Sequence, residues 1–293
     1  MDPILKQFAA KSLIDEKEYQ VRIFEPFRIV EEINKAYPEK SNRYAVNLGC
    51  GDGKSMNDPV HPLFAKGYAG LAVEGEKNED LFRNLPAKNI HKLSGMFVTP
   101  YNVCEMLDIY NCPRDCDFFK IDLDGYDGVV LRTALESGFR PKVLQAEVNP
   151  EIPPPVSFCV MYDEKYLPHD AQGNNGGFYG ASLGYMDDLC KRYGYRIAQI
   201  DFVTQWTHDV TLVHEEFMEI LEQHVGKDFL QMSASDLFLS HPPGYSHFKE
   251  YGIDSLSWRY ETDYCRLIGK VWAACLSADQ RKHEGYSVPF HLS

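Results

Sequence analysis

Short apolar runs alternate along the chain with segments in which apolar residues are spaced as on a helix. We expect the apolar runs to be strands, at residues 44–48, 70–73, 90–93, 117–122 and 143–147. Helix-spaced segments lie among them at residues 79–85 and 128–137, and another follows at 181–192. Strands that alternate with helices in this way form a parallel sheet covered by helices. The pattern therefore predicts an α/β protein.

The last two strands, at residues 195–203 and 208–214, are joined by only a few residues. So short a connection requires an antiparallel pair, because parallel neighbours need a long crossover. We therefore predict a seven-stranded, mostly parallel, Rossmann-like sheet with a terminal antiparallel strand. That strand separates the plan from an ordinary dinucleotide-binding domain.

The two ends of the chain are predicted to be helical. Residues 1–40 form an N-terminal helical segment whose second amphipathic stretch runs from Phe27 to Ile33 and stops near Pro38. Residues 41–214 form the core, in which the proline- and glycine-rich region 151–180 is a long loop. Residues 215–293 form a C-terminal helical extension that packs on the core, and its helices are a candidate contact between copies of the chain.

Composition narrows the class of partner. The chain has 293 residues, 44% hydrophobic and 25% charged, and a formal net charge of −13 at pH 7. Such a surface repels phosphate backbones and anionic lipids, so we expect no nucleic-acid partner and no membrane association. No apolar stretch approaches the roughly 18 residues that span a bilayer. We expect a soluble, cytoplasmic protein with a small-molecule partner.

A glycine-rich segment follows the first predicted strand. It reads Asn-Leu-Gly-Cys-Gly-Asp-Gly over residues 47–53, and its glycines allow a sharp turn against which a ligand can lie. A helix that begins after this loop would offer free N–H groups to an anion. The dinucleotide fingerprint G-x-G-x-x-G requires a glycine at position 54, where this chain has Lys54. The pattern G-x-G-x-G fits better.

An acidic residue, Glu74, ends the second predicted strand. A carboxylate at this place can accept hydrogen bonds from both hydroxyls of a ribose. Glu76 takes this role if the strand ends later. The position indicates an adenosyl or nucleotide ligand without distinguishing between them.

The fourth strand runs into Lys-Ile-Asp-Leu-Asp-Gly-Tyr-Asp over residues 120–127. Together with residues 47–53, this segment resembles the hallmark of FkbM-type methyltransferases, roughly Lys-Ile-Asp-Val-Glu-Gly followed by an acid two residues later. The resemblance covers about residues 44–150, and Asp124 stands in place of the hallmark's glutamate. It implies a class I methyltransferase fold, S-adenosylmethionine as the methyl donor, and an oxygen acceptor on a small molecule or sugar. The residues assigned to the cofactor are Asn47, Gly49, Cys50, Gly51, Gly53, Glu74 and Asp122.

Further polar residues lie at the ends of the fourth and fifth strands, where α/β sheets bind ligands. One expected role is to position the cofactor and the acceptor. The alternative is a Mg²⁺ site formed by Asp122, Glu147 and Asn149. An acceptor hydroxyl or amine must lose a proton, for which the candidates are Asp122, Asp124, His169 and His208. The glycine-rich stretch at residues 172–180 is a candidate lid, and Tyr162 and Tyr179 are candidate substrate contacts.

Two other functions remain open. A nucleotide-cofactor oxidoreductase of the NAD type fits Glu74 and the alternating plan, but it conflicts with Lys54 and with the terminal hairpin. A non-catalytic binding protein that retains a methyltransferase fold is the second alternative.

Overall fold

We describe the fold from a computed structural model. The structure describes residues 25–54, 58–149, 152, 154, 156–164, 179–202, 208–225, 231–240 and 290–292.

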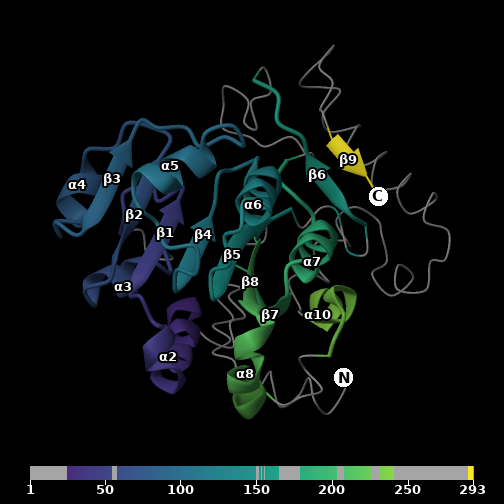
Figure 1. Cartoon of the computed structure of the whole chain (residues 1–293). Helices are drawn as coiled ribbons and strands as arrows, with labels where there is room; N and C mark the ends of the chain where they lie inside the picture. Colours follow the sequence, from purple (N-terminus) through teal and green to yellow (C-terminus); the bar gives the residue numbers. More distant parts are fainter. Residues whose placement is uncertain are drawn as a thin grey trace.

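A seven-stranded sheet forms the centre of the molecule (Figure 1), with the strand order β3-β2-β1-β4-β5-β8-β7. Neighbours among the first five strands pair in parallel, whereas β8 runs antiparallel to β5 on one side and to β7 on the other. The predicted sheet and its closing antiparallel strand are therefore confirmed. The strands are β1 (Tyr44–Leu48), β2 (Ala69–Glu74), β3 (Ile90–Ser94), β4 (Phe118–Ile121), β5 (Val143–Val148), β7 (Tyr195–Phe202) and β8 (His208–His214).

The middle strands are buried along their whole length. Every residue of β4 and of β5 is buried, including Lys120, Gln145 and Glu147. Strands covered on both faces are almost continuously apolar, which is why these runs are conspicuous in the sequence. Two of these polar exceptions, Lys120 and Glu147, lie toward the carboxyl ends of their strands.

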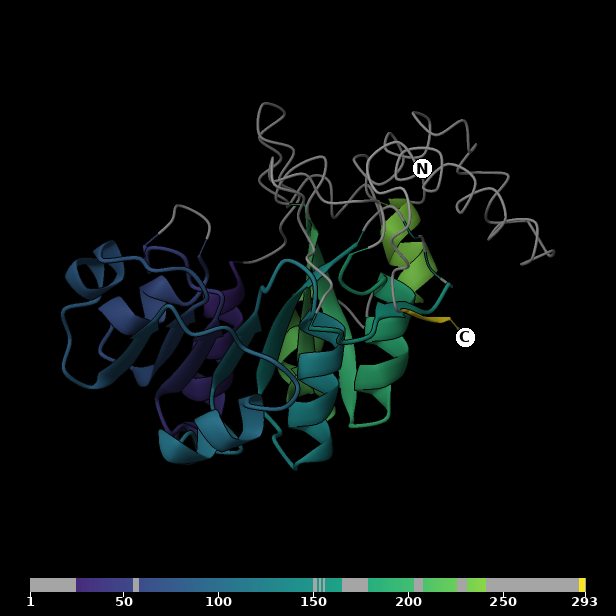
Figure 2. The same cartoon turned by 90° about the horizontal axis from the view of Figure 1, so that it is seen from above.

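Helices cover the sheet. Successive helices α5, α6 and α7 contact one another and lie along one face (Figure 2). Helices α2 and α8 pack together at the lower end of the sheet in Figure 1. The α-helices are α2 (Pro26–Ala36), α3 (His61–Ala65), α4 (Asp80–Asn84), α5 (Val103–Ile109), α6 (Asp127–Glu136), α7 (Leu183–Lys191), α8 (Met218–Val225) and α10 (Ala234–Ser240), and the 3₁₀-helices are η1 (Pro38–Lys40) and η2 (Glu215–Phe217).

Predicted helix positions agree with α2, α4, α6 and α7 to within a few residues. Helix α2 buries Ile29, Val30 and Ile33, as its spacing predicts. Gly138, with φ +93°, ends α6 in the left-handed conformation expected after a helix. Helices α3 and α5 were not predicted.

Two strands correct the sequence interpretation. Strand β6 (Phe158–Val160) lies inside the region 151–180 that we expected to be a loop, and β9 (Phe290–Leu292) lies inside the extension that we expected to be helical. They pair antiparallel with each other in a separate two-stranded sheet. This pairing brings the end of the chain beside the segment that follows α6 and β5, which no local pattern in the sequence indicates.

A buried acid, Asp117, connects three segments at the lower end of the sheet. Asp117 is fully buried just before β4, and its carboxylate accepts hydrogen bonds from the side chains of Asn34 and Ser41. It also forms an ion pair with Lys142, whose Nζ lies 2.6 Å from Oδ1 of Asp117. The backbone N–H groups of Asn42 and Arg43 donate to the same carboxylate. Helix α2, the entry to β1 and the entry to β5 are therefore joined at one side chain.

The remaining predictions about the ends of the chain fall mostly outside the described residues. These include the helices at residues 1–24 and 241–289, and with them the domain limits and the contact between copies. In the part of the chain that the structure covers, no helix combines the length and apolar character needed to cross a bilayer.

Candidate functional site

The three stretches singled out in the sequence meet in one pocket of about 730 Å³. It opens at the carboxyl ends of β1, β2 and β4. Among the predicted site residues, the pocket is lined by Gly49, Cys50, Gly51, Glu74, Asp122 and Asp124. Neighbouring strand ends bring these residues together, as the parallel sheet predicts.

Gly49 provides the closest contact between two of these stretches. Its φ of +79° lies in the left-handed region, and a Cβ built on it would lie 1.6 Å from the carbonyl oxygen of Asp122. The backbone N–H of Asp122 in turn donates to Leu48 at 2.9 Å. A side chain at position 49 would therefore push β1 and β4 apart at the point where the pocket begins.

Glu74 joins the glycine-rich loop to the end of β2. Its Oε2 accepts the backbone N–H of Gly51 at 2.6 Å, and its Oε1 accepts that of Glu76 at 3.0 Å. A carboxylate has about four lone-pair sites, so both oxygens keep capacity for a ligand's hydroxyls. The acid is thus held in place by the backbone and faces the pocket. Glu76, the fallback candidate, also lines the pocket.

The glycine-rich loop does not present a ring of free amides. The N–H groups of Gly49 and Cys50 donate to the carbonyl of Val73, and that of Gly53 donates to Cys50. Helix α3 begins only at His61, and the described residues between it and the loop are not helical. A helix therefore follows the loop, as expected, but not directly, and its contact with an anion stays a prediction.

Asn47 and Gly53 lie outside the lining of the pocket. Asn47 is buried and its Nδ2 donates to Oδ2 of Asp58 at 2.6 Å. Asp58 also accepts the backbone N–H of Val60 at 2.7 Å, and it lines the pocket itself. Asn47 therefore supports a lining acid that the sequence analysis missed, since Asp58 belongs to no recognisable local pattern.

A buried lysine lies beneath the pocket's acids. Lys120 donates to Oδ2 of Asp122 at 2.9 Å and to the carbonyl of Gly49 at 3.3 Å. Burial by itself lowers the pKa of Lys120, but the carboxylates of Asp122, Asp58 and Asp209 outweigh it and raise that pKa above its ordinary value. Lys120 therefore carries a fixed positive charge at the junction of β1 and β4. The sequence pattern alone gives Lys120 no role.

Behind the pocket, acids from β4, β5 and the turn after β4 gather. Glu147 on β5 is buried, and burial together with the charge of Asp122 raises its pKa well above the usual range. Asp127, the first residue of α6, accepts backbone N–H groups from Leu123 and Gly125. Burial and Asp122 nevertheless raise the pKa of Asp127 to about 7. Acidic groups are therefore crowded on this side of the pocket, and burial favours the protonated forms of Glu147 and Asp127.

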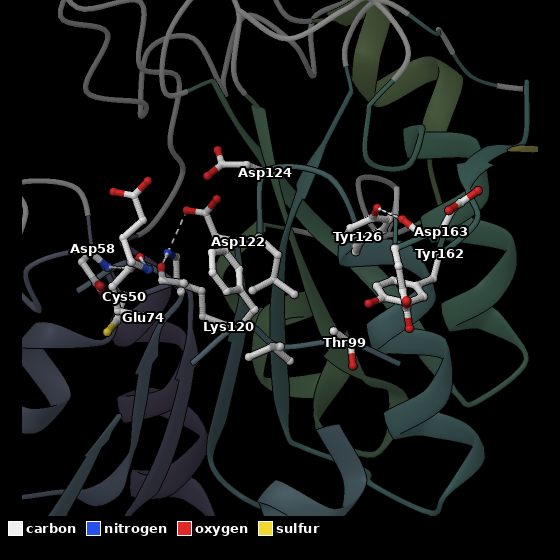
Figure 3. A pocket seen from close by; sticks show the side chains of 18 residues that line it. Cys50, Asp58, Glu74, Thr99, Lys120, Asp122, Asp124, Tyr126, Tyr162 and Asp163 are labelled. Carbon is white, nitrogen blue, oxygen red and sulfur yellow. Dashed lines mark hydrogen bonds and ion pairs between the residues drawn. The ribbon is translucent and has the colours of Figure 1, made fainter. Parts of the chain in front are cut away.

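Aromatic side chains form the opposite side. Tyr162 contacts Tyr101 and Tyr126, with ring centroids 5.2 and 5.0 Å apart. The hydroxyl of Tyr126 donates to the carbonyl of Asp163 at 2.9 Å. Figure 3 shows Cys50 and Glu74 at one end of the pocket, Tyr126 and Tyr162 at the other, and Asp122 between them. Tyr162 was a predicted substrate contact, whereas Tyr126 was missed.

The remaining candidates from the sequence lie outside the pocket lining or outside the described residues. Asn149 is buried outside the pocket lining, and its Nδ2 donates to the carbonyl of Tyr179 at 3.0 Å. His208 begins β8, but its side chain lies outside the described part of the structure, as do His169 and most of the glycine-rich stretch at 172–180. Their roles stay predictions.

Comparisons with known proteins gave structural matches only. No protein-family model matches the sequence, and neither does any curated protein. The structure is similar to TnmH (13% identity, TM-score 0.33, covering 64% of this chain and 54% of TnmH). It is also similar to human N-acetylserotonin methyltransferase in complex with SAM (10%, 0.32, 63% and 51%) and to a putative hemolysin from Lactococcus lactis (10%, 0.37, 67% and 96%).

The match therefore spans about half of TnmH and of the human enzyme. The strand order, with the antiparallel β8 inserted between β5 and β7, is a feature of the fold alone. By that order, the chain has the Rossmann-like fold of class I methyltransferases.

Proposed function

We propose that this protein is an S-adenosylmethionine-dependent methyltransferase that acts on an oxygen of a small-molecule or sugar-like acceptor. The observation that carries the proposal is the convergence of Gly51, Glu74 and Asp122 on one pocket at the strand ends. Bound S-adenosylmethionine would supply a methyl group on a positively charged sulfur, which becomes a neutral thioether once the acceptor oxygen has attacked the methyl carbon.

Different lining residues are suited to the ribose and to the carboxylate of this cofactor. Glu74, fixed by two backbone N–H groups, is placed to accept the ribose hydroxyls. The absence of a side chain at Gly49 lets the ends of β1 and β4 pack closely, and the pocket opens beyond these strand ends. Because the loop amides are largely engaged in internal hydrogen bonds, Lys120 is the cationic group in the lining that supports binding of the cofactor's carboxylate.

The acceptor is assigned to the aromatic end of the pocket. The rings of Tyr126 and Tyr162 offer flat, partly apolar surfaces to a ring-shaped acceptor. Asp122 lies between the two ends, so its carboxylate is the candidate to orient the acceptor and to take the hydroxyl proton. Asp124, His169 and His208 remain proposed alternatives for that proton.

The cofactor is tested by comparing S-adenosylmethionine with NADH in thermal unfolding. A ligand that binds only the folded chain raises its melting temperature, by an amount that grows with the ratio of ligand concentration to Kd. We expect a rise with S-adenosylmethionine and none with NADH. A rise with NADH alone would replace the proposal by a nucleotide-dependent oxidoreductase. Binding of S-adenosylmethionine without methyl transfer to any of a panel of hydroxylated acceptors would favour the non-catalytic alternative.

A further inference from the structure

Three carboxylates from two neighbouring strand ends converge beside the pocket. Asp122 follows β4, Asp124 lies two residues further on, and Glu147 is near the end of β5. One oxygen of each lies within 4.8 Å of the others. Figure 3 shows the carboxylates of Asp122 and Asp124 next to each other above Lys120. Three like charges so close together repel one another unless a positive charge lies among them.

Glu147 shows that this cluster is incomplete by itself. The residue is 5% exposed, and within the described part of the chain its Oε2 has no hydrogen-bond partner. Buried polar atoms in native proteins nearly always have one, and a buried carboxylate oxygen is among the most costly to leave without it. That oxygen belongs to the same side chain that contributes to the three-carboxylate cluster.

Neighbouring groups do not fill this need. The ammonium of Lys120 donates to Asp122 and to the carbonyl of Gly49. The nearby Asp127 is itself an acid, and its two oxygens accept backbone N–H groups of Leu123 and Gly125. A group that satisfies Glu147 must therefore come from outside the described chain and must be attracted by three carboxylates.

We propose that Asp122, Asp124 and Glu147 hold a hard divalent cation, Mg²⁺ or Mn²⁺, at the edge of the pocket. Such cations select carboxylate oxygens and keep other coordination positions for water or substrate. The three-carboxylate cluster contains two residues of the sequence prediction, Asp122 and Glu147, and adds Asp124. The side-chain nitrogen of Asn149, the third predicted ligand, donates to the carbonyl of Tyr179.

The position of the cluster assigns a task to the cation. Asp122 and Asp124 line the pocket and Glu147 lies behind them, so the remaining coordination positions open toward the pocket. An acceptor hydroxyl bound there would be oriented and made more acidic. This part rests on the proposed function, whereas cation binding does not.

The test is a titration of the purified full-length protein with Mn²⁺ in the absence of S-adenosylmethionine, after removal of metals with EDTA. Bound Mn²⁺ is counted by the loss of the free-ion signal in electron paramagnetic resonance. We expect one site in the wild-type protein that Mg²⁺ competes for. Mutation of a residue that only supports a metal ligand already lowers metal affinity by about 10–100-fold. Replacement of a ligand itself, in Glu147→Gln or Asp124→Asn, should therefore weaken Mn²⁺ binding by at least that factor.

Two features keep the variants interpretable. Asn tolerates the left-handed backbone of Asp124, where φ is 55°, and Gln preserves the size of Glu147. Glu164→Gln is the matched control, because Glu164 lines the same pocket outside the cluster, and it should bind Mn²⁺ as the wild type does.

Thermal unfolding gives an independent readout. Without metal, Glu147→Gln should melt at a higher temperature than the wild type, because it removes a buried charge from a repulsive cluster. Mn²⁺ should then raise the melting temperature of the wild type and not that of the variant.

Absence of a Mn²⁺ site in the wild type, or equal affinity in Glu147→Gln, would overturn the proposal. Either result leaves S-adenosylmethionine binding untouched, so failure of the cation site and failure of the cofactor site are distinguishable.

Discussion

The backbone N–H of Gly51 donates to Oε2 of Glu74 at 2.6 Å, across two strand ends that are neighbours in the sheet. This bond fixes the acid at the pocket's edge and shapes the glycine-rich loop around it. This edge of the pocket is thus shaped by a hydrogen bond between backbone and side chain. We therefore expect the site to be largely formed before any ligand binds.

Replacement of Gly49 should disrupt the sheet. Gly49→Ala places a Cβ 1.6 Å from the carbonyl of Asp122, so β1 and β4 must separate. The matched control is Gly67→Ala, which has a similar φ of +84° but no atom within 4 Å of the added Cβ. We expect the control to lose about 1–2 kcal/mol of unfolding free energy from backbone strain alone. Urea denaturation should show a clearly larger loss for Gly49→Ala, and equal losses would refute the packing argument.

The Asp117 network should carry much of the stability at the lower end of the sheet. Asp117→Ala leaves the ammonium of Lys142 buried without its acidic partner, and such losses cost roughly 3–5 kcal/mol. Glu136→Ala is the contrast, because its exposed pair with Arg132 spans 3.9 Å and should contribute only a few tenths of a kcal/mol. Chemical denaturation of the two variants measures both losses of unfolding free energy. A cost for Asp117→Ala as small as that for Glu136→Ala would contradict the role of the network.

His214 should make the fold sensitive to mild acid. Burial lowers the pKa of His214 below its ordinary value of 6.5, although Glu216 and Glu215 oppose the shift. Its Nδ1 accepts the backbone N–H of Glu216 at 3.5 Å, which requires the neutral ring. The unfolded chain therefore binds the proton more readily, so this contribution is complete above the ordinary pKa and is lost as the pH falls through and below it.

The comparison that isolates this effect is His214→Asn, since asparagine caps a helix without titrating. When the pH is lowered from about 7.5 to about 5.5, the urea midpoint should fall further in the wild type than in the variant. The same fall in both proteins would show that other groups cause the acid sensitivity.

The sequence predicted those parts of the fold that depend on local pattern. Strands β4 and β5 are buried on both faces, so their apolar runs were unmistakable, and the short link from β7 to β8 allowed only an antiparallel pair. Parallel strand ends necessarily share an edge, which is why Gly51, Glu74 and Asp122 were correctly brought together. The pairing of β6 with β9 joins distant segments and has no local signal.

The rest of the site depends on where side chains point in three dimensions. Asn47 sits within the glycine-rich motif, yet it turns into the protein and supports Asp58. The buried oxygen of Glu147 without a partner becomes visible only when burial and hydrogen bonds are known. Neither feature follows from spacing along the chain, because both depend on neighbours supplied by other strands.

The central claim is that Glu74 holds the adenosyl cofactor, and isothermal titration calorimetry with S-adenosylmethionine tests it most directly. Loss of hydrogen bonds to a charged group should cost Glu74→Gln about 1–3 kcal/mol of binding free energy. Glu76→Gln is the matched control, because Glu76 lines the pocket two residues away, and its affinity should stay close to that of the wild type. Wild-type affinity in Glu74→Gln, or no binding of S-adenosylmethionine by the wild-type protein, would contradict the account.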